Sequence, residues 1–200
     1  MGNSANAPLT VATAFPIAPT TTNVSTVWKW IASSSQWAFY TPTQADGGQA
    51  YAATKGYAFL TTINGGEGFW VNAKTGLTAS LPTGTPIPSS IFADSSTGGT
   101  NALPPGWSLI AVGDNPSPRN FVNRIAVSPP SAPLVAATSL TTLWAWNNAS
   151  SSWYFYAPGL DNASTLTSYI TGKSYLNFSA TATTQAKTLD STTGFWVNHP

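Results

Sequence analysis

The chain of 200 residues carries seven Lys and Arg against six Asp and Glu, so that only 6% of its side chains are charged and the net charge is +1. A typical soluble domain carries about 25% charged residues. So few cations exclude a nucleic-acid binder of the basic-patch kind, the lack of cysteine excludes disulfide scaffolds and thiol catalysis, and no apolar run approaches the roughly 20 residues that cross a bilayer.

The predicted elements are short β-strands separated by turns. In chain order, strands are expected at 26–31, 37–40, 58–63 and 68–72, because these runs are rich in aromatic and β-branched residues and are bounded by turn formers. Residues 33–36 read as a hairpin loop, and 46–48 and 64–66 as Gly-containing turns. Helical periodicity is weak, so 49–55 and 166–171 are expected to form one or two helical turns at most.

A repeat then organises the chain. Residues 26–42 are matched by 142–158 at one constant offset, and further matches follow at slightly larger offsets, as expected when two copies differ by loop insertions. The matched residues are Trp28, Trp30, Trp37, Phe39, Tyr40 and Pro42 with Trp144, Trp146, Trp153, Phe155, Tyr156 and Pro158; Tyr51, Lys55 and Tyr57 with Tyr169, Lys173 and Tyr175; and Gly68–Asn72 with Gly194–Asn198.

The repeat defines the expected architecture. It is an all-β protein of two tandem, diverged copies of a small antiparallel sandwich or barrel-like module, at 1–75 and 105–200. Residues 76–104, rich in Pro, Thr, Ser and Gly, form the connection, and Ile87, Ile91 and Phe92 suggest that it packs against the modules. The second copy opens with the apolar strand at 105–115, which the first copy lacks. Either the chain simply starts inside the first copy, or a strand from elsewhere fills the gap.

The ordered motifs carry a resemblance. Gly-Trp-x-Leu at 106–109, Trp-x-Trp at 28–30, Trp-x-Phe-Tyr-x-Pro at 37–42, Tyr-x-x-x-Lys-x-Tyr at 51–57 and Gly-Phe-Trp-Val-Asn at 68–72 resemble a tandem module of secreted or surface proteins of Gram-negative bacteria. The resemblance implies an exported bacterial β-module and carries over no catalytic residues. The uncharged Ser-, Thr-, Asn- and Gly-rich composition also favours an extracellular or cell-surface protein, although Met1–Ser4 is not the start of a signal peptide.

Strand alternation separates the aromatic residues into two classes. Residues two apart on a strand share a face. Trp28 and Trp30 therefore lie opposite Lys29, and because Lys29 prefers water, we expect these two tryptophans in the core. The same expectation is extended to Trp37, Trp107, Trp144, Trp146 and Trp153, since a small β-domain short of aliphatic residues can build its core from tryptophan.

The alternation of side chains between the two faces of a strand also predicts a binding surface. Phe69 and Val71 are expected inside and Trp70 and Asn72 outside, and Tyr40 is expected to face away from the core. The candidate ligand-binding residues are Trp70, Tyr40 and Asn72, with their counterparts Trp196, Tyr156 and Asn198. The alternative is that a second sheet, or the other copy, covers the face that bears Trp70 and Trp196.

No catalytic or metal-binding constellation is found in the sequence. The acids do not recur at aligned positions, and the single histidine, His199, is expected in a frayed tail, so neither catalytic residues, nor a metal site, nor a cofactor is predicted. The leading hypothesis is a non-catalytic module that binds a polysaccharide or cell-surface glycan. The alternative is a structural or assembly module, such as an adhesin stalk, surface-layer or filament subunit, that self-associates through an open β edge.

Overall fold

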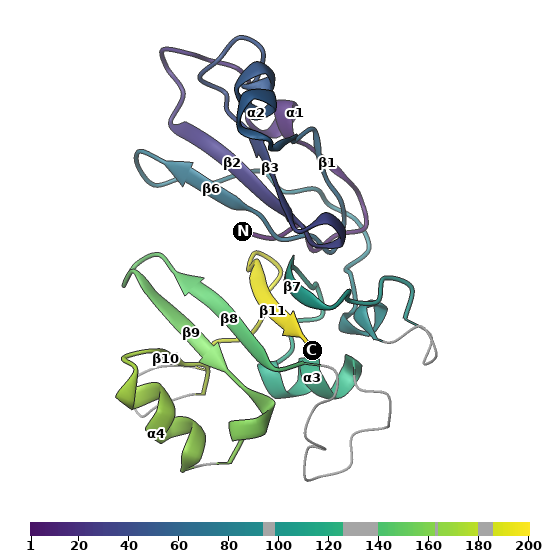
Figure 1. Cartoon of the computed structure of the whole chain (residues 1–200), viewed down its shortest axis with the longest axis vertical. Helices are drawn as coiled ribbons and strands as arrows, with labels where there is room; N and C mark the ends of the chain where they lie inside the picture. Colours follow the sequence, from purple (N-terminus) through teal and green to yellow (C-terminus); the bar gives the residue numbers. More distant parts are fainter. Residues whose placement is uncertain (94–98, 126–139, 163, 180–185) are drawn as a thin grey trace.

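The computed structural model describes residues 1–93, 99–125, 140–162, 164–179 and 186–200, and it is β-rich, with three sheets and short helices (Figure 1). Parts of the expected connection and of the expected second module therefore lie outside the described residues. The upper half in Figure 1 contains a four-stranded sheet and the lower half a five-stranded one, and the N-terminus lies between the two halves.

The sheet of the upper half has the strand order β4-β3-β2-β6. Its strands are β2 (Val24–Ile31), β3 (Gln36–Tyr40), β4 (Ala58–Phe59) and β6 (Trp70–Ala73). A separate two-stranded sheet pairs β1 (Leu9–Thr10) with β5 (Thr62–Ile63), so the single strand expected at 58–63 is divided between two sheets. The helices of this half are α1 (Val11–Ala14) and α2 (Gln49–Lys55), with a 3-10 turn at Ala32–Ser34.

The sheet of the lower half has the strand order β10-β9-β8-β11-β7. Its strands are β7 (Gly106–Ile110), β8 (Thr142–Asn147), β9 (Ser152–Tyr156), β10 (Leu176–Asn177) and β11 (Phe195–His199), and its helices are α3 (Pro118–Ile125) and α4 (Thr165–Gly172), with a 3-10 turn at Pro158–Leu160. His199 is not frayed, because it ends β11 and pairs with Gly106. The order equals that of the upper sheet except for β7, which adds a strand beside β11.

The modules are not purely antiparallel, and this corrects the sequence-based expectation. β3 and β4 run parallel, as do β9 and β10. Parallel neighbours need a crossover connection, and α2 and α4 lie in these connections. The two helices thus convert a hairpin meander into a mixed sheet at the same place in each half.

Each half has its own hydrophobic core. The upper core is built around residues such as Val27, Ile63 and Phe69, and the lower core around Phe121, Leu143, Phe195 and others. The segment between the halves also packs inward: the 3-10 turn η2 (Ser89–Phe92) buries Phe92 to 3% exposure, against the lower core. No helix in the described part of the chain is long and apolar enough to cross a membrane.

Candidate functional site

The tryptophans of β2 do not lie on the core face. Val27 is fully buried and Ile31 packs against the upper core, so the face they share with Lys29 is the core face. Trp28 and Trp30 are half-buried on the opposite face, and the expectation that they form the core is wrong. The other tryptophans expected in the core are also half-buried, except Trp107, which is 43% exposed.

Lys29 misled the prediction because its charge has a distant partner. Its side chain is only 12% exposed, and Nζ lies 2.8 Å from Glu67 Oε2 and 3.2 Å from the carbonyl oxygen of Thr62. A buried charge is tolerated when it is paired and hydrogen-bonded in this way. In the lower half the aligned residues are Ala145 and Thr193, so that this pair belongs to one half alone.

Tyr40 and Tyr156 are also on the core side, which corrects their nomination as binding residues. They are 2% and 4% exposed. The Tyr40 hydroxyl donates to the carbonyl oxygen of Phe15 at 2.7 Å, and the Tyr156 hydroxyl donates to Asp161 Oδ2 at 2.6 Å. Each tyrosine can therefore face the core because its polar end is satisfied there, and burial raises the pKa of both hydroxyls, with the Asp161 carboxylate raising that of Tyr156 further.

The exposed-side tryptophans of the two halves meet in two matching clusters, which we call the tryptophan interface. In one cluster Trp196 of the lower half lies 6.1 Å from Trp30 and 5.8 Å from Trp37, between ring centroids. In the other, Trp70 of the upper half lies 6.3 Å from Trp146 and 5.7 Å from Trp153. These are the repeat-related residues with the halves exchanged, so the same contact is made twice, once in each direction.

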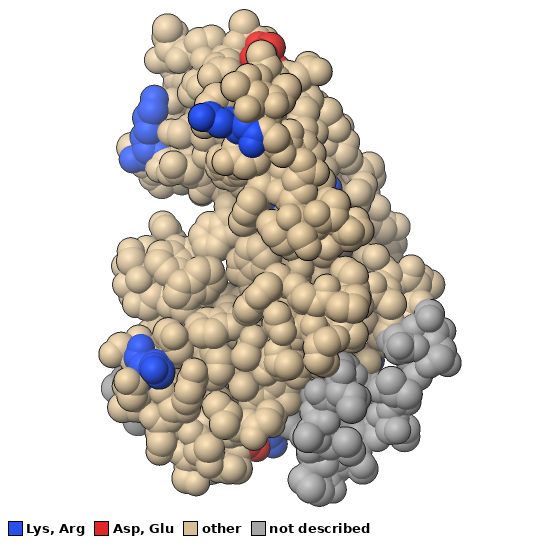
Figure 2. All heavy atoms as spheres, in the orientation of Figure 1, with Lys and Arg blue, Asp and Glu red and all other residues tan. Residues whose placement is uncertain are grey.

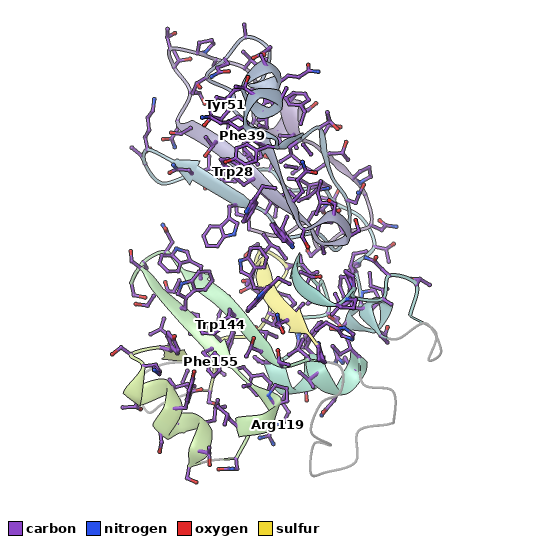
Figure 3. The ribbon with its side chains drawn as sticks, in the orientation of Figure 1. Trp28, Phe39, Tyr51, Arg119, Trp144 and Phe155 are labelled. Atoms are coloured by element: carbon purple, nitrogen blue, oxygen red, sulfur yellow. The ribbon has the colours of Figure 1, made fainter. Side chains whose placement is uncertain are left out.

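The aromatic layer continues outward on both sheets, as Figure 3 shows for the labelled residues. In the upper half, the ring centroids of Trp28 and Phe39 are 4.6 Å apart, and those of Phe39 and the exposed Tyr51 of α2 are 5.2 Å apart. In the lower half, the ring centroids of Trp144 and Phe155 are 4.6 Å apart, and those of Phe155 and Tyr169 of α4 are 5.0 Å apart. Edge-on and tilted rings of this kind are the preferred aromatic arrangements.

A groove of about 1200 Å³ lies between the halves beside the tryptophan interface. We call it the tryptophan groove; Figure 2 shows a hollow between the two halves, bordered in that view by uncharged atoms. Its lining mixes aromatic faces with amide and hydroxyl groups, and its only ionisable side chains are Tyr57 and Lys74. The aromatic lining residues are Trp28, Trp37, Tyr57, Phe69, Trp70, Trp146, Trp153 and Trp196, and the polar ones include Thr26, Asn72, Thr75, Asn148, Thr192 and Thr193.

The groove contains three of the six predicted site residues: Trp70, Asn72 and Trp196. Asn198 does not line it; its Oδ1 accepts a hydrogen bond from Thr141 at 2.7 Å. Sequence reasoning missed Trp28, Trp37, Trp146, Trp153 and Asn148, which it assigned to the core or to a loop. The signal that would have found the tryptophans is the pair of aliphatic residues, Val27 and Ile31, on the Lys29 face.

The groove is bounded at the centre of the molecule by two extended segments that cross at glycines. Phe69 and Met1 exchange backbone hydrogen bonds, each at 2.9 Å, while Gly68 N–H donates to Leu109 O at 3.0 Å. A Cβ at Gly194 would lie 2.0 Å from Met1 O. Glycine at these two repeat-related positions is therefore required by close backbone approach.

The described carboxylates are engaged in local structure. Asp46 accepts the N–H groups of Gly48 and Ala50, both at 2.9 Å, at the start of α2, and these bonds lower its pKa. Asp161 Oδ2 accepts hydrogen bonds from Arg119 Nε and from the Tyr156 hydroxyl. No group of three or more His, Cys, Asp or Glu that could hold a metal ion occurs among the described residues.

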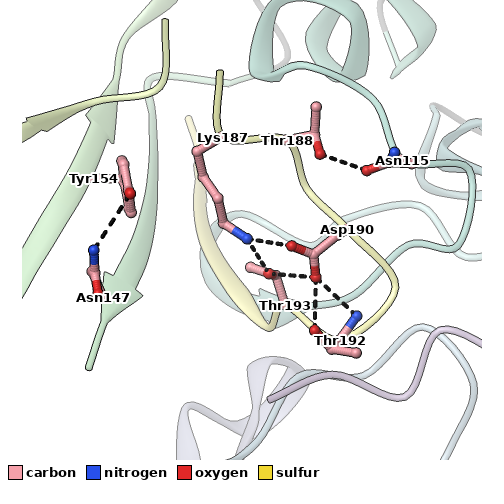
Figure 4. A network of polar contacts seen from close by, with 8 residues as sticks. All are labelled: Asn115, Asn147, Tyr154, Lys187, Thr188, Asp190, Thr192 and Thr193. Atoms are coloured by element: carbon pink, nitrogen blue, oxygen red, sulfur yellow. Dashed lines mark hydrogen bonds and ion pairs between the residues drawn. The ribbon is translucent and has the colours of Figure 1, made fainter. Parts of the chain in front are cut away.

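Asp190 also has a lowered pKa, and its cause is a network of side-chain hydrogen bonds. Asp190, shown in Figure 4, receives hydrogen bonds from the side chains of Lys187, Thr192 and Thr193. Burial alone would raise its pKa, but these donors lower it to about 2. The network fixes the turn that precedes β11 and so positions Trp196.

Comparisons with protein-family models, with curated proteins and with solved structures found no match. The groove itself indicates what the chain can bind. It combines aromatic faces from both halves, free amides and an almost uncharged wall, which suits a neutral ligand with both apolar and hydroxyl surfaces.

Proposed function

We propose that this chain binds a neutral glycan, without catalysis, in the tryptophan groove. The observation that carries the proposal is that half-buried tryptophans of both halves and two exposed amides, Asn72 and Asn148, line one groove. Sugar rings present apolar C–H faces that stack on aromatic rings and hydroxyls that bond to amides. Covering about 80–100 Å² of one ring at ~25 cal/mol/Å² contributes roughly 2 kcal/mol before ordering costs.

The near absence of charge favours a neutral ligand over an acidic one. Lys74 is the one cationic side chain among the described residues of the lining, and its Nζ donates to the carbonyl oxygen of Thr22 at 3.3 Å. An acidic polysaccharide would gain little from a single solvated cation. The volume of about 1200 Å³ and the lining by residues of both halves further favour a chain of several sugars over a monosaccharide.

We also propose the finer architecture on which this site depends: two diverged copies of one β-module, exported to the cell surface. The matched sheet orders, the paired parallel crossovers and the exchanged tryptophan contacts support the duplication. In this arrangement residues of both copies line one shared groove, and the two copies do not form two separate binding sites. A short glycan is therefore expected to bind at one site per chain.

The test should use the amides, because Trp70 and Trp196 also hold the two halves together. Asn72→Ala combined with Asn148→Ala is expected to weaken binding to neutral polysaccharides in affinity electrophoresis by about tenfold or more, since each lost hydrogen bond contributes about 1 kcal/mol. The melting temperature should stay nearly unchanged, because both side chains are exposed and neither makes a hydrogen bond to another described residue.

Asn101→Ala is the matched control, since Asn101 is an exposed asparagine that does not line the groove. Trp70→Phe provides a second variant that keeps an aromatic ring but reduces its area. If a panel of neutral polysaccharides binds wild type and the double variant equally, or binds neither, the glycan proposal is wrong.

A further inference from the structure

Aromatic residues on the groove side of the upper sheet form a row across neighbouring strands. Trp70 of β6 stands opposite Trp28 of β2, and Trp28 stands opposite Phe39 of β3. Beyond β3 the row continues onto α2, where the Tyr51 ring packs against Phe39 with 5.2 Å between centroids. In Figure 3 Trp28, Phe39 and Tyr51 follow one another away from the lower half. The row therefore leads from Trp70 and Trp28, which line the groove, to the exposed surface of α2.

Tyr57 connects the groove with this outer surface. It lines the groove, and its ring centroid lies 5.1 Å from that of Trp28 and 6.3 Å from that of Phe39. Phe39 is only 3% exposed, so it supports the Tyr57 and Tyr51 rings without offering a surface of its own. The Trp28 ring is fixed by a hydrogen bond from Nε1 to Thr26 Oγ1 at 3.0 Å. Rings that are held in place in this way lower the ordering cost of binding.

The outer end of the row combines an aromatic ring with polar groups. Tyr51 is 41% exposed, and its hydroxyl makes no hydrogen bond to another described residue. Lys55 Nζ lies 5.9 Å from the centroid of the Tyr51 ring and likewise has no hydrogen-bond acceptor among the described residues. An apolar ring with a hydroxyl and an ammonium group beside it repeats the mixture of apolar and hydrogen-bonding surface that lines the groove.

Building on the glycan binding proposed above, we infer that a long glycan leaves the groove over Trp28, Tyr57 and Tyr51, which we call the tyrosine strip. The strip binds the sugars that follow those held in the groove, so the ligand is an extended neutral polysaccharide. Neighbouring strands are about 4.8 Å apart, which is close to the length of one sugar in an extended chain. Rings that follow one another across the strands therefore meet successive sugars, and each covered ring adds apolar contact area.

The lower half has the same rings without the same connection to the groove. Tyr169 of α4 is 39% exposed and packs against Phe155 with 5.0 Å between centroids, as its counterpart does in the upper half. The described lining of the groove, however, includes neither Trp144 nor Tyr175, the counterparts of the first two residues of the strip. The glycan is therefore expected to extend over the upper half alone, and Tyr169 provides a matched control.

The experiment measures how affinity depends on the length of the glycan. Oligosaccharides of three and six sugars from β-1,4-glucan, β-1,4-xylan, β-1,4-mannan and α-1,4-glucan are titrated into the full chain by calorimetry. Tyr51→Leu keeps an apolar side chain on Phe39 and should leave the melting temperature nearly unchanged. We expect it to bind the six-sugar ligand about fivefold more weakly than wild type, because one stacking ring is lost, and to bind the three-sugar ligand equally well. Tyr51→Trp, which enlarges the ring, should bind the six-sugar ligand at least as tightly as wild type.

Tyr169→Leu is the control and should bind both ligands like wild type. An equal loss of affinity in Tyr51→Leu and Tyr169→Leu overturns the inference, as does an equal loss for both ligand lengths in Tyr51→Leu. If Asn72→Ala combined with Asn148→Ala weakens binding of the six-sugar ligand and Tyr51→Leu does not, the groove binds glycan and the tyrosine strip does not. If none of the oligosaccharides binds the wild-type chain, the glycan proposal fails and this inference fails with it.

Discussion

Asp190 stabilises the turn before β11 with its side chain, and the aligned turn of the upper half uses other polar groups. Its carboxylate lies before β11 and accepts hydrogen bonds from two threonines and from Lys187. The aligned residue of the upper half is Asn64, whose N–H bonds to Glu67 Oε2 at 2.6 Å. The two halves thus stabilise the same turn with different polar groups, and the sequence shows the turn but not which groups satisfy it.

The lowered pKa of Asp190 predicts an acid-dependent loss of stability. Its pKa is about 2 in the folded chain against 3.8 for an ordinary aspartate, so the folded state prefers the charged form. This contribution is fully present above about pH 4 and is lost as the pH falls towards 2. Urea unfolding of wild type and Asp190→Asn at pH 5, 4, 3 and 2 should show a stability difference that shrinks with falling pH. A difference that stays constant over this range would contradict the assignment.

The alternation of side chains along each strand could be read from the sequence, but the core-facing side was predicted correctly on β6 and wrongly on β2. Phe69 and Val71 were placed on the core side, and Phe69 is 1% exposed and Val71 packs against the upper core. On β2 the same reasoning failed, because it treated Lys29 as solvated. The partner of Lys29, Glu67, is far away in sequence, and only the fold brings it within 2.8 Å.

At the scale of elements, α2 was predicted within its observed bounds, and the crossover that it makes was not. The window 49–55 coincides with α2 (Gln49–Lys55). Strand direction depends on which neighbour β4 finds after the helix, and β4 is only two residues long. Such a short strand carries too little pattern to show that it runs parallel to β3.

The crossing of the two extended segments makes a sharp prediction about glycine. A Cβ at Gly194 would lie 2.0 Å from a backbone oxygen, and one at Gly68 would lie 2.9 Å from Ile110 O. Because backbone cannot move aside as a flexible side chain can, Gly194→Ala and Gly68→Ala should each destabilise the chain by about 1–3 kcal/mol or more. Denaturant unfolding measures this loss.

Gly76→Ala is the control for these substitutions, because no described atom outside Gly76 and its two chain neighbours lies within 4 Å of its Cβ position. Its stability should be equal to or slightly above that of wild type. Equal stability of Gly194→Ala and Gly76→Ala would show that the segments do not cross as closely as described.

At the scale of the whole molecule, the matches between the two parts of the sequence could be read, but the contact between the matched tryptophans could not be predicted. The sequence pairs Trp70 with Trp196, and it left open whether the other copy covers them. The structure places each against tryptophans of the opposite half, so the candidate site is a property of the assembled halves. Neither half alone carries the groove, and no periodicity within one copy could have predicted it.

The tryptophan interface predicts that the two halves unfold together. Trp70 and Trp196 each contact two rings of the other half, and the central segments exchange backbone hydrogen bonds across the halves as well. Hydrogen exchange measured at increasing denaturant concentration reports when each strand unfolds. In the wild-type chain the amides of β3 and β9 should lose protection in one transition.

In the double variant Trp70→Ser with Trp196→Ser, the two strands should lose protection at separate denaturant concentrations. Tyr51→Ser, on the exposed α2 and away from the interface, should keep the single transition. Two transitions in the wild-type chain would show that the halves are energetically independent and that the groove is not held as one unit.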